Sequence, residues 1–117
     1  MHELGIASSI IERMERTARE QNARVTKVGV RIGELSAVDP DALSFGFEVL
    51  TKDTPFEGVK LEIEFCRRVQ RCRDCAHQFE TEAMFTECPQ CGSLHTLCIG
   101  GDELDIAYIE VEDPVCA

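Results

Sequence analysis

The chain is predicted to have an α+β fold in which two helices pack on a three-stranded sheet and a four-cysteine module is inserted between two strands. Three features of the 117-residue sequence support this arrangement. Amphipathic stretches with a helical period occur at about residues 4–21 and after Pro40, and stretches with the period of a strand occur at residues 28–32, 59–65 and 104–111. Two Cys-x-x-Cys pairs separate the last two strands. Two amphipathic helices on one face of a small sheet is the economical packing for these elements.

Both helices are indicated by apolar residues that recur at steps of three and four. The stripe of the first helix is expected to face the core and comprises Leu4, Ala7, Ile11, Met14 and Ala18. The second helix is expected to begin at Asp39-Pro40, because aspartate is a good N-cap and proline suits the first helical position. Its apolar face is expected to comprise Leu43, Phe47 and Leu50, with Phe45 and Val49 flanking it.

The strands are indicated by alternation of apolar and polar residues. The clearest example is residues 59–65, and a shorter alternation marks residues 28–32. In residues 104–111 the alternation shifts phase after Tyr108. This shift predicts either a β-bulge or a strand that is covered on both faces.

The composition is acidic and rich in cysteine. There are 22 Asp and Glu against 12 Lys and Arg, a formal net charge of −10. This charge disfavours tight binding to nucleic acid or to anionic lipid. The seven cysteines cannot all form internal disulfides, and neither a secretory signal nor a membrane-length apolar run is expected. The protein is therefore predicted to be cytoplasmic, where clustered cysteines more often hold a metal than form disulfides.

The four-cysteine module is the strongest local signal. Cys72 and Cys75 form one Cys-x-x-Cys pair, and Cys88 and Cys91 form the other, twelve residues further on. Each pair can wrap a tight turn so that four thiolates surround one ion, which is the closed tetrahedral arrangement of structural zinc. A rubredoxin-like iron centre for electron transfer is the alternative, because tetrahedral sulfur suits both metals. The chain then divides into an α/β domain, residues 1–66 and 99–117, and a metal-binding module, residues 67–98.

Other residues near the module are given ordinary roles. The remaining cysteines are expected to act as small apolar residues, and the nearby histidines are expected to lie in surface loops; these are Cys66, Cys98, Cys116, His77 and His95. Zinc ribbons often bind nucleic acid, and Arg67, Arg68, Arg71 and Arg73 form a small basic cluster. Acidic residues offset the cluster and no aromatic residues interleave it, so a solvated rim or a docking patch for an acidic protein is favoured.

The amino terminus carries a second candidate metal site in Met1, His2 and Glu3. The methionine is expected to be retained because His2 is large, which leaves a free α-amine one residue before an imidazole. The amine, the amide nitrogen of His2 and its imidazole can close fused chelate rings, and Glu3 can add an amide nitrogen or a carboxylate. Nickel(II) and copper(II) favour such nitrogen-rich, planar surroundings.

Several short motifs together make the chain resemble the HypA/HybF family of hydrogenase-maturation nickel chaperones over about residues 1–112. The most specific are the N-terminal tripeptide and the Cys-x-x-Cys pairs at their spacing. The tripeptide continues into Leu4, and the other motifs are Ile32-Gly33-Glu34-Leu35-Ser36, Phe45-Gly46-Phe47-Glu48 and Gly101-Asp102-Glu103-Leu104.

The resemblance implies a non-enzymatic nickel metallochaperone. It implies nickel binding by Met1, His2 and Glu3, with His2 as the essential side chain, and structural zinc on the four paired cysteines. It also implies a HypB-type GTPase as a partner, the large subunit of nickel–iron hydrogenase as the recipient, and urease and its accessory proteins as further clients in some members. No nucleotide-binding loop or catalytic constellation stands out in the sequence, so any GTP hydrolysis is assigned to a partner.

Overall fold

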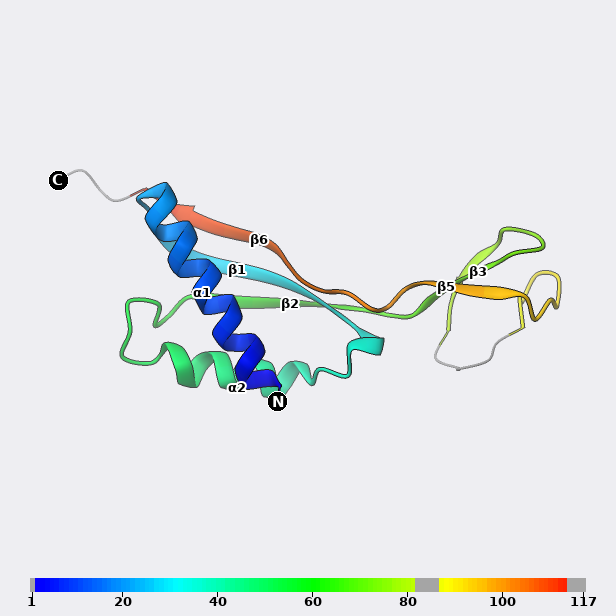
Figure 1. Ribbon diagram of the computed structural model, residues 1–117, viewed down its shortest axis with the longest axis horizontal. Coiled ribbons are helices and arrows are strands. Elements are labelled where there is room, and N and C mark those ends of the chain that lie inside the picture. The colour runs from blue at the N-terminus through cyan, green and yellow to red at the C-terminus, as the bar shows by residue number, and fades with distance from the viewer. Residues whose placement is uncertain (1, 82–86, 114–117) are drawn as a thin grey trace.

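The computed structural model describes residues 2–81 and 87–113. Two helices and six strands follow one another along this part of the chain (Figure 1). Their bounds are α1 (Glu3–Gln21), β1 (Arg24–Gly33), α2 (Pro40–Thr51), β2 (Lys60–Cys66), β3 (Val69–Cys72), β4 (Gln78–Glu80), β5 (Thr96–Gly100) and β6 (Leu104–Glu112), with a single 3₁₀ turn, Glu34–Ser36, after β1. None of the helices in the described part is long and apolar enough to cross a membrane.

The first sheet has the strand order β2-β1-β6. β1 pairs with β2 in parallel, with α2 as the crossover, and with β6 in an antiparallel arrangement. The first strand in the sequence is therefore the central strand, and the strand that follows the cysteine module returns to its free side. This arrangement confirms the predicted three-stranded sheet with an inserted module.

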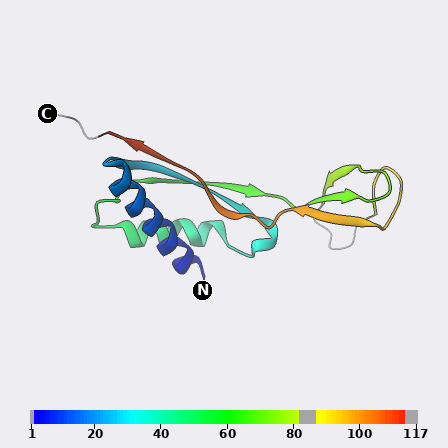
Figure 2. The ribbon, with the colours of Figure 1, turned by 45° about the horizontal axis from the view of Figure 1, so that its top comes forward.

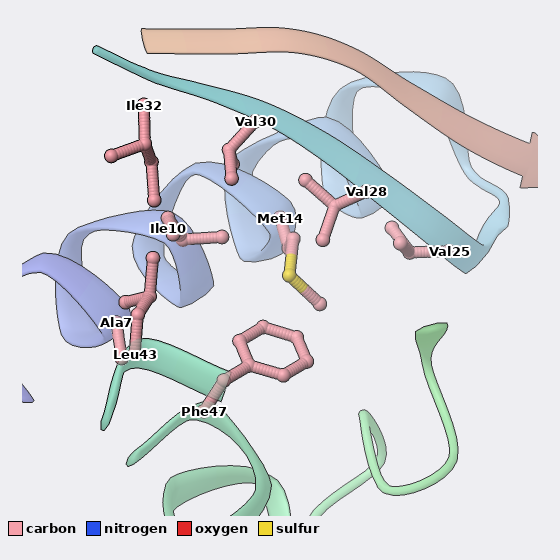
Figure 3. Packing of buried hydrophobic residues seen from close by; sticks show 9 residues of the cluster. All are labelled: Ala7, Ile10, Met14, Val25, Val28, Val30, Ile32, Leu43 and Phe47. Carbon is pink, nitrogen blue, oxygen red and sulfur yellow. The ribbon is translucent and has the colours of Figure 1, made fainter. Parts of the chain in front are cut away.

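Both helices lie against one face of this sheet (Figures 1 and 2). Their buried side chains meet those of β1 in a single core (Figure 3): Ala7, Ile10, Met14, Val25, Val28, Val30, Ile32, Leu43 and Phe47. The alternate residues of β1 point to the uncovered face, where Lys27 lies 3.3 Å from Glu62 and 3.6 Å from Glu110. The sheet is thus apolar on one face and ionic on the other, as expected when only one face is covered.

The two apolar stripes differ in part from the predicted ones. Ile10 is buried in α1, whereas Ile11 and Ala18 only border the core. Leu4 is 58% exposed and Leu50 is 39% exposed. Both were expected in the core, and neither belongs to it. α1 crosses the strands obliquely, whereas α2 runs roughly along them (Figures 1 and 2). Leu4, at the start of α1, lies against Gly46 of α2 rather than in the core.

The predicted start of α2 is confirmed. A side-chain oxygen of Asp39 accepts hydrogen bonds from the backbone N–H groups of Asp41, at 2.9 Å, and Ala42, at 3.4 Å. Pro40 occupies the first helical position, where its missing N–H costs nothing.

The predicted phase shift in the last strand is also confirmed, and it is a bulge. Gly29 pairs with Tyr108, but the next residue, Val30, pairs with Ile106, so Ala107 is the extra residue. The bulge lets Ile106 and Ile109 both pack against the core although they are three positions apart, an offset that would place them on opposite faces of a regular strand.

A second sheet with the order β4-β3-β5 forms the cysteine module. The three short strands were not predicted, because they are only three to five residues long and carry little alternation. The two sheets lie end to end, which gives dimensions of 63 × 28 × 16 Å and a radius of gyration of 18.5 Å (Figure 1). A single compact domain of this length would have a radius of about 13 Å.

The two lobes meet where the chain passes from β5 to β6. The N–H of Gly33 donates to the carbonyl of Glu103, and the N–H of Leu35 donates to the carbonyl of Gly101, both at 2.6 Å. A Cβ on Gly33 would lie only 2.1 Å from the carbonyl oxygen of Gly101. Glycine is therefore required at the end of β1 so that two backbones can approach each other closely.

Candidate metal centres

The four paired cysteines lie on two tight turns that face each other. Cys72 ends β3, and Cys75 lies in the turn that follows it; Cys88 and Cys91 lie in the turn before β5. Each turn is closed by a backbone hydrogen bond, from the N–H of Ala76 to the carbonyl of Cys72 and from the N–H of Gly92 to the carbonyl of Cys88. The sequence thus builds the same turn twice.

The residue after each pair adopts a left-handed conformation. Gly92 has φ = +78°, as expected for a glycine at this position, and Ala76 has φ = +67°. A Cβ makes this conformation unfavourable, so the first turn stores a small strain that the second avoids.

The sulfur atoms are close enough to share one ion. All four Sγ atoms lie within 4.8 Å of one another, with 3.5 Å between Cys72 and Cys91 and 3.6 Å between Cys75 and Cys88. A tetrahedral zinc with Zn–S bonds of about 2.3 Å requires S···S separations of about 3.8 Å. The donor set and its spacing therefore fit zinc, and among the described residues this is the only such cluster of potential metal ligands.

The thiols of the cluster differ in acidity. Burial opposes ionisation of Cys72, but hydrogen bonds from the backbone N–H groups of Cys75 and Asp74 and from neighbouring thiols outweigh it and lower the pKa of Cys72 to about 7. The N–H of Ser93 favours ionisation of Cys91, but the neighbouring sulfurs and burial outweigh it and raise the pKa of Cys91 to about 12. One thiolate forms readily while four together repel each other, so the cluster needs a cation to be fully ionised.

Asp74 links the two turns from outside. Its carboxylate accepts a hydrogen bond from the hydroxyl of Ser93 and lies 3.4 Å from Nδ1 of His95. The hydrogen bond from Ser93 holds the pKa of Asp74 below its ordinary range. His77 stacks on Phe79, with ring centroids 5.9 Å apart. Neither histidine belongs to the four-sulfur cluster.

The cysteines outside the pairs lie apart from this site. Cys66 is half-buried at the end of β2, and its pKa is raised by burial. Cys98 is exposed in β5, so the expectation that it packs as a small apolar residue is wrong. Its thiol donates instead to the carbonyl of Gly100. Cys116 lies outside the described residues.

The residues of the predicted basic cluster lie at the junction between the lobes and in the second lobe. Arg68 pairs with Glu34 across the junction between the lobes at 3.9 Å, and both side chains are largely buried. Arg71 lies in β3 and Arg73 in the turn between Cys72 and Cys75.

The N-terminal candidates lie at the free end of α1. His2 is exposed and precedes the helix, and its carbonyl accepts a hydrogen bond from the N–H of Ile6 at 3.0 Å. Met1 lies outside the described residues. Glu3 begins the helix, and its carboxylate accepts a hydrogen bond from the N–H of Asp39 at 3.1 Å. This hydrogen bond is the main cause of the lowered pKa of Glu3.

The contact between Glu3 and Asp39 could not be found from the sequence, because the two residues are 36 positions apart. It brings the beginnings of α1 and α2 together, and a Cβ on Gly46 would lie 3.1 Å from Leu4. The first turn of α1 is therefore anchored beside α2, while His2 is exposed.

Comparison with known proteins places the chain in a family. The family model described as "Hydrogenase/urease nickel incorporation, metallochaperone, hypA" matches residues 1–111. The hydrogenase maturation factor HypA of Geotalea uraniireducens (strain Rf4) is 41% identical over 112 residues, covering 96% of this chain and all of that protein. The factor of the same name from Nostoc sp. is 41% identical over 116 residues, covering 99% of each chain.

Solved structures agree with this assignment. The solution structure of the Ni metallochaperone HypA from Helicobacter pylori has 28% sequence identity and a TM-score of 0.63, covering 97% of this chain and all of that chain. Another solution structure of a HypA protein has 28% identity and a TM-score of 0.72, covering 97% and 98%. The chain belongs to the HypA family of hydrogenase/urease nickel-incorporation metallochaperones.

Proposed function

We propose that this protein binds Ni(II) through Met1, His2 and Glu3 and delivers it during the maturation of nickel–iron hydrogenase in the cytoplasm. The observation that carries the proposal is the position of His2, which is exposed at the free end of α1 while the next residue is anchored to α2. A ligand set at such an end combines access for an acceptor with a fixed location. Urease maturation is a second client process that the family description supports.

The proposed ligands divide by chemistry. The α-amine of Met1 and the imidazole and amide nitrogens of His2 supply nitrogen donors, which favour planar Ni(II). Glu3 supplies its amide nitrogen or its carboxylate. Because the carboxylate of Glu3 already accepts a hydrogen bond from Asp39, its use as a ligand requires that bond to be shared or broken. The amide nitrogen is therefore the better-placed donor.

The proposal assigns zinc to Cys72, Cys75, Cys88 and Cys91. Its support is the sulfur spacing, together with the composition of the second lobe, whose buried residues in the described part are Gln70, Cys72 and Cys88. Bound zinc holds the two turns together and so supplies folding free energy to a lobe with little apolar core. In these terms residues 67–98 are a structural zinc module, and residues 1–66 with 99–117 form the nickel-binding domain.

Delivery is proposed to proceed by ligand exchange with protein partners and involves no catalytic step in this chain. The partners proposed are a HypB-type GTPase, the large subunit of nickel–iron hydrogenase and, for urease, its accessory proteins. Nucleic acid and membranes are not proposed as partners, since a net charge of −10 opposes binding to either. Protonation of His2 competes with nickel, so loading weakens as the pH falls.

Calorimetric titration of nickel into untagged protein tests the N-terminal site. His2→Ala and acetylation of the α-amine each remove one proposed donor, and His77→Ala is the matched control because it removes a histidine outside the site. We expect both changes at the terminus to abolish tight binding and the control to retain it. Unchanged affinity in both terminal variants would falsify the N-terminal site.

Metal analysis of the purified protein tests the second site. We expect about one zinc per chain, held by the single cluster of four cysteines. Iron in its place, with the absorption of a sulfur-bound ferric centre, would instead support the electron-transfer alternative.

A further inference from the structure

We propose that an apolar groove beside the first turns of α1 is the docking site for a basic amphipathic segment of the protein that receives or helps to transfer the nickel. This inference rests on the proposed function, because it uses the N-terminal residues as the metal-carrying end. It adds the surface that a partner recognises and the chemistry of that partner.

The groove lies between α1 and the sheet, on the side of β6. Its volume is about 400 Å³ and its walls are largely apolar; they include Ile6, Ile10, Ile32, Leu104 and Ile106. Gly5 and Ser9 form the rim on α1, and a Cβ on Gly5 would meet no atom within 4 Å. Leu104 lines the groove although 49% of its surface is exposed. A cavity of this size accepts one or two large apolar side chains.

Exposed apolar residues continue on the other flank of α1. Leu4 is 58% exposed and packs next to Gly46 of α2, whose neighbours Phe45 and Val49 are 68% and 50% exposed. Phe45 and Val49 are four positions apart and therefore lie on the same side of α2. These three residues do not line the groove, but they add exposed apolar surface at the start of α1 and on α2, and exposed apolar patches are typical of protein-binding surfaces.

The helix segments that border this surface carry charges of one sign, whereas Asp105, the charged residue that lines the groove, pairs with Arg31. Residues 2–12 and 34–51 contain six carboxylates and no lysine or arginine; the acidic residues are Glu3, Glu12, Glu34, Asp39, Asp41 and Glu48. The rest of α1 is different, since Arg13, Arg16 and Arg19 follow within two turns. An apolar site with an acidic surround selects an apolar anchor flanked by lysine or arginine.

The same charges argue against a second copy of this chain as the occupant. In a two-fold dimer each groove would face the same acidic surface of the other copy, which places like charges together. A basic helix satisfies both the groove and its surround, and apolar anchors spaced along a helix are a common way to fill such a groove.

The groove lies close to the proposed nickel ligands. Gly5 is three residues from His2, or about 4.5 Å along the helix axis. A partner that places its anchor in the groove therefore holds its own ligands next to the nickel. Docking and metal transfer would then occur at the start of α1, near the label N in Figure 1.

The test uses the full-length protein loaded with zinc, and a synthetic leucine–lysine helix of about 18 residues, or five turns, as the probe. Binding is measured by fluorescence anisotropy and located by backbone amide shifts in NMR spectra. Two further peptides, alanine–lysine and leucine–glutamate, separate the apolar contribution from the charge. We expect only the leucine–lysine peptide to bind and to shift the amides of Gly5, Ser9 and Leu104.

Two variants decide the location. Gly5→Leu adds a large side chain at the rim of the groove, where a Cβ meets no atom within 4 Å, and is expected to weaken peptide binding about tenfold or more. Gln21→Leu makes a similar apolar change on the exposed last turn of the same helix and is expected to leave binding unchanged. Thermal unfolding checks that both variants fold, and calorimetric nickel titration checks that both keep the affinity of the parent.

Equal binding by the alanine–lysine peptide, shifts confined to the second lobe, or unchanged affinity in Gly5→Leu would each overturn the docking site. If the unsubstituted protein is a dimer and Gly5→Leu makes it a monomer, the groove binds a second copy of this chain, and the proposed docking site is likewise overturned. Nickel titration tests the N-terminal site and peptide binding tests the groove. Because the two measurements are separate, a failure of the proposed function is distinguishable from a failure of the docking site.

Discussion

The hydroxyl of Tyr108 donates a hydrogen bond to the carboxylate of Glu62 across the central strand of the first sheet. The two residues lie on β6 and β2, which are not paired with each other, and the tyrosine ring spans the gap over Gly29. A Cβ at Gly29 would lie 2.2 Å from that ring, so the absence of a side chain on β1 makes the bridge possible. Both edge strands are thereby tied together on the face that the helices do not cover.

Glu62→Gln is expected to lower the pKa of Tyr108. The hydrogen bond to Glu62 is the main reason that the pKa of Tyr108 is raised above its ordinary value, and the same bond is the main reason that the pKa of Glu62 is lowered. The chain has one tyrosine and no tryptophan, so the absorbance of tyrosinate reports this residue alone. Glu64→Gln, the same charge change two residues away, is the control; an equal shift in both variants would contradict the bridge.

Stability is expected to fall at both ends of the pH range because of this bridge. A raised tyrosine pKa contributes stability below the unfolded value of about 10, and this stability is lost as the pH rises through the folded pKa. A lowered glutamate pKa contributes stability above the unfolded value of about 4.3, and this is lost as the pH falls through the folded pKa. Denaturant unfolding at several pH values should show that Tyr108→Phe flattens the alkaline decline.

Gly33→Ala is expected to destabilise the protein by about 1–3 kcal/mol or more, because the new Cβ would overlap the backbone of Gly101 and neither backbone can move freely. Gly5→Ala is the opposite case. It adds a Cβ in open space within a helix and is expected to stabilise by about 0.5–1 kcal/mol. Both values are measured by denaturant unfolding, and a neutral Gly33→Ala would show that the junction between the lobes is not tightly packed.

Asp39→Ala is expected to cost about 1 kcal/mol of unfolding free energy, because two N–H groups at the start of α2 lose their acceptor. Asp39→Asn keeps a side-chain oxygen at the same position and is expected to lie within a few tenths of a kcal/mol of the parent. A similar loss in both variants would mean that the charge of Asp39, rather than its capping hydrogen bonds, stabilises the helix.

Metal removal is expected to unfold the second lobe and leave the first folded. The apolar core of the first lobe contains no residue of the module, whereas two ligand cysteines are among the few buried residues of the second. Amide hydrogen exchange after chelation should show loss of protection in β3 and β5 and retained protection in β1. Cys88→Ser should have the same effect as chelation, whereas Cys98→Ser, outside the cluster, should not; unfolding of both lobes together would refute their independence.

Local features were predictable because their causes are local. The capping of α2 by Asp39 needs only the geometry of a helix N-terminus, and the alternation in β2 needs only the pleat of a strand. The spacing of Cys72, Cys75, Cys88 and Cys91 was enough to predict a shared metal site, since a Cys-x-x-Cys turn directs both sulfurs to one point. The phase shift in β6 likewise predicted either a bulge or a strand covered on both faces, because the side-chain period of a strand is two, and the structure shows the bulge.

Other features were decided only by tertiary structure, because they depend on residues far apart in the sequence. The sequence determined that helices, strands and a four-cysteine module exist; it did not determine that β1 is central, or that Leu4 and Leu50 are exposed. Apolar periodicity states which side of a helix is apolar, whereas burial requires a second surface opposite it. The groove beside Gly5 and the hydrogen bond between Glu3 and Asp39 arise in the same way, where two elements meet.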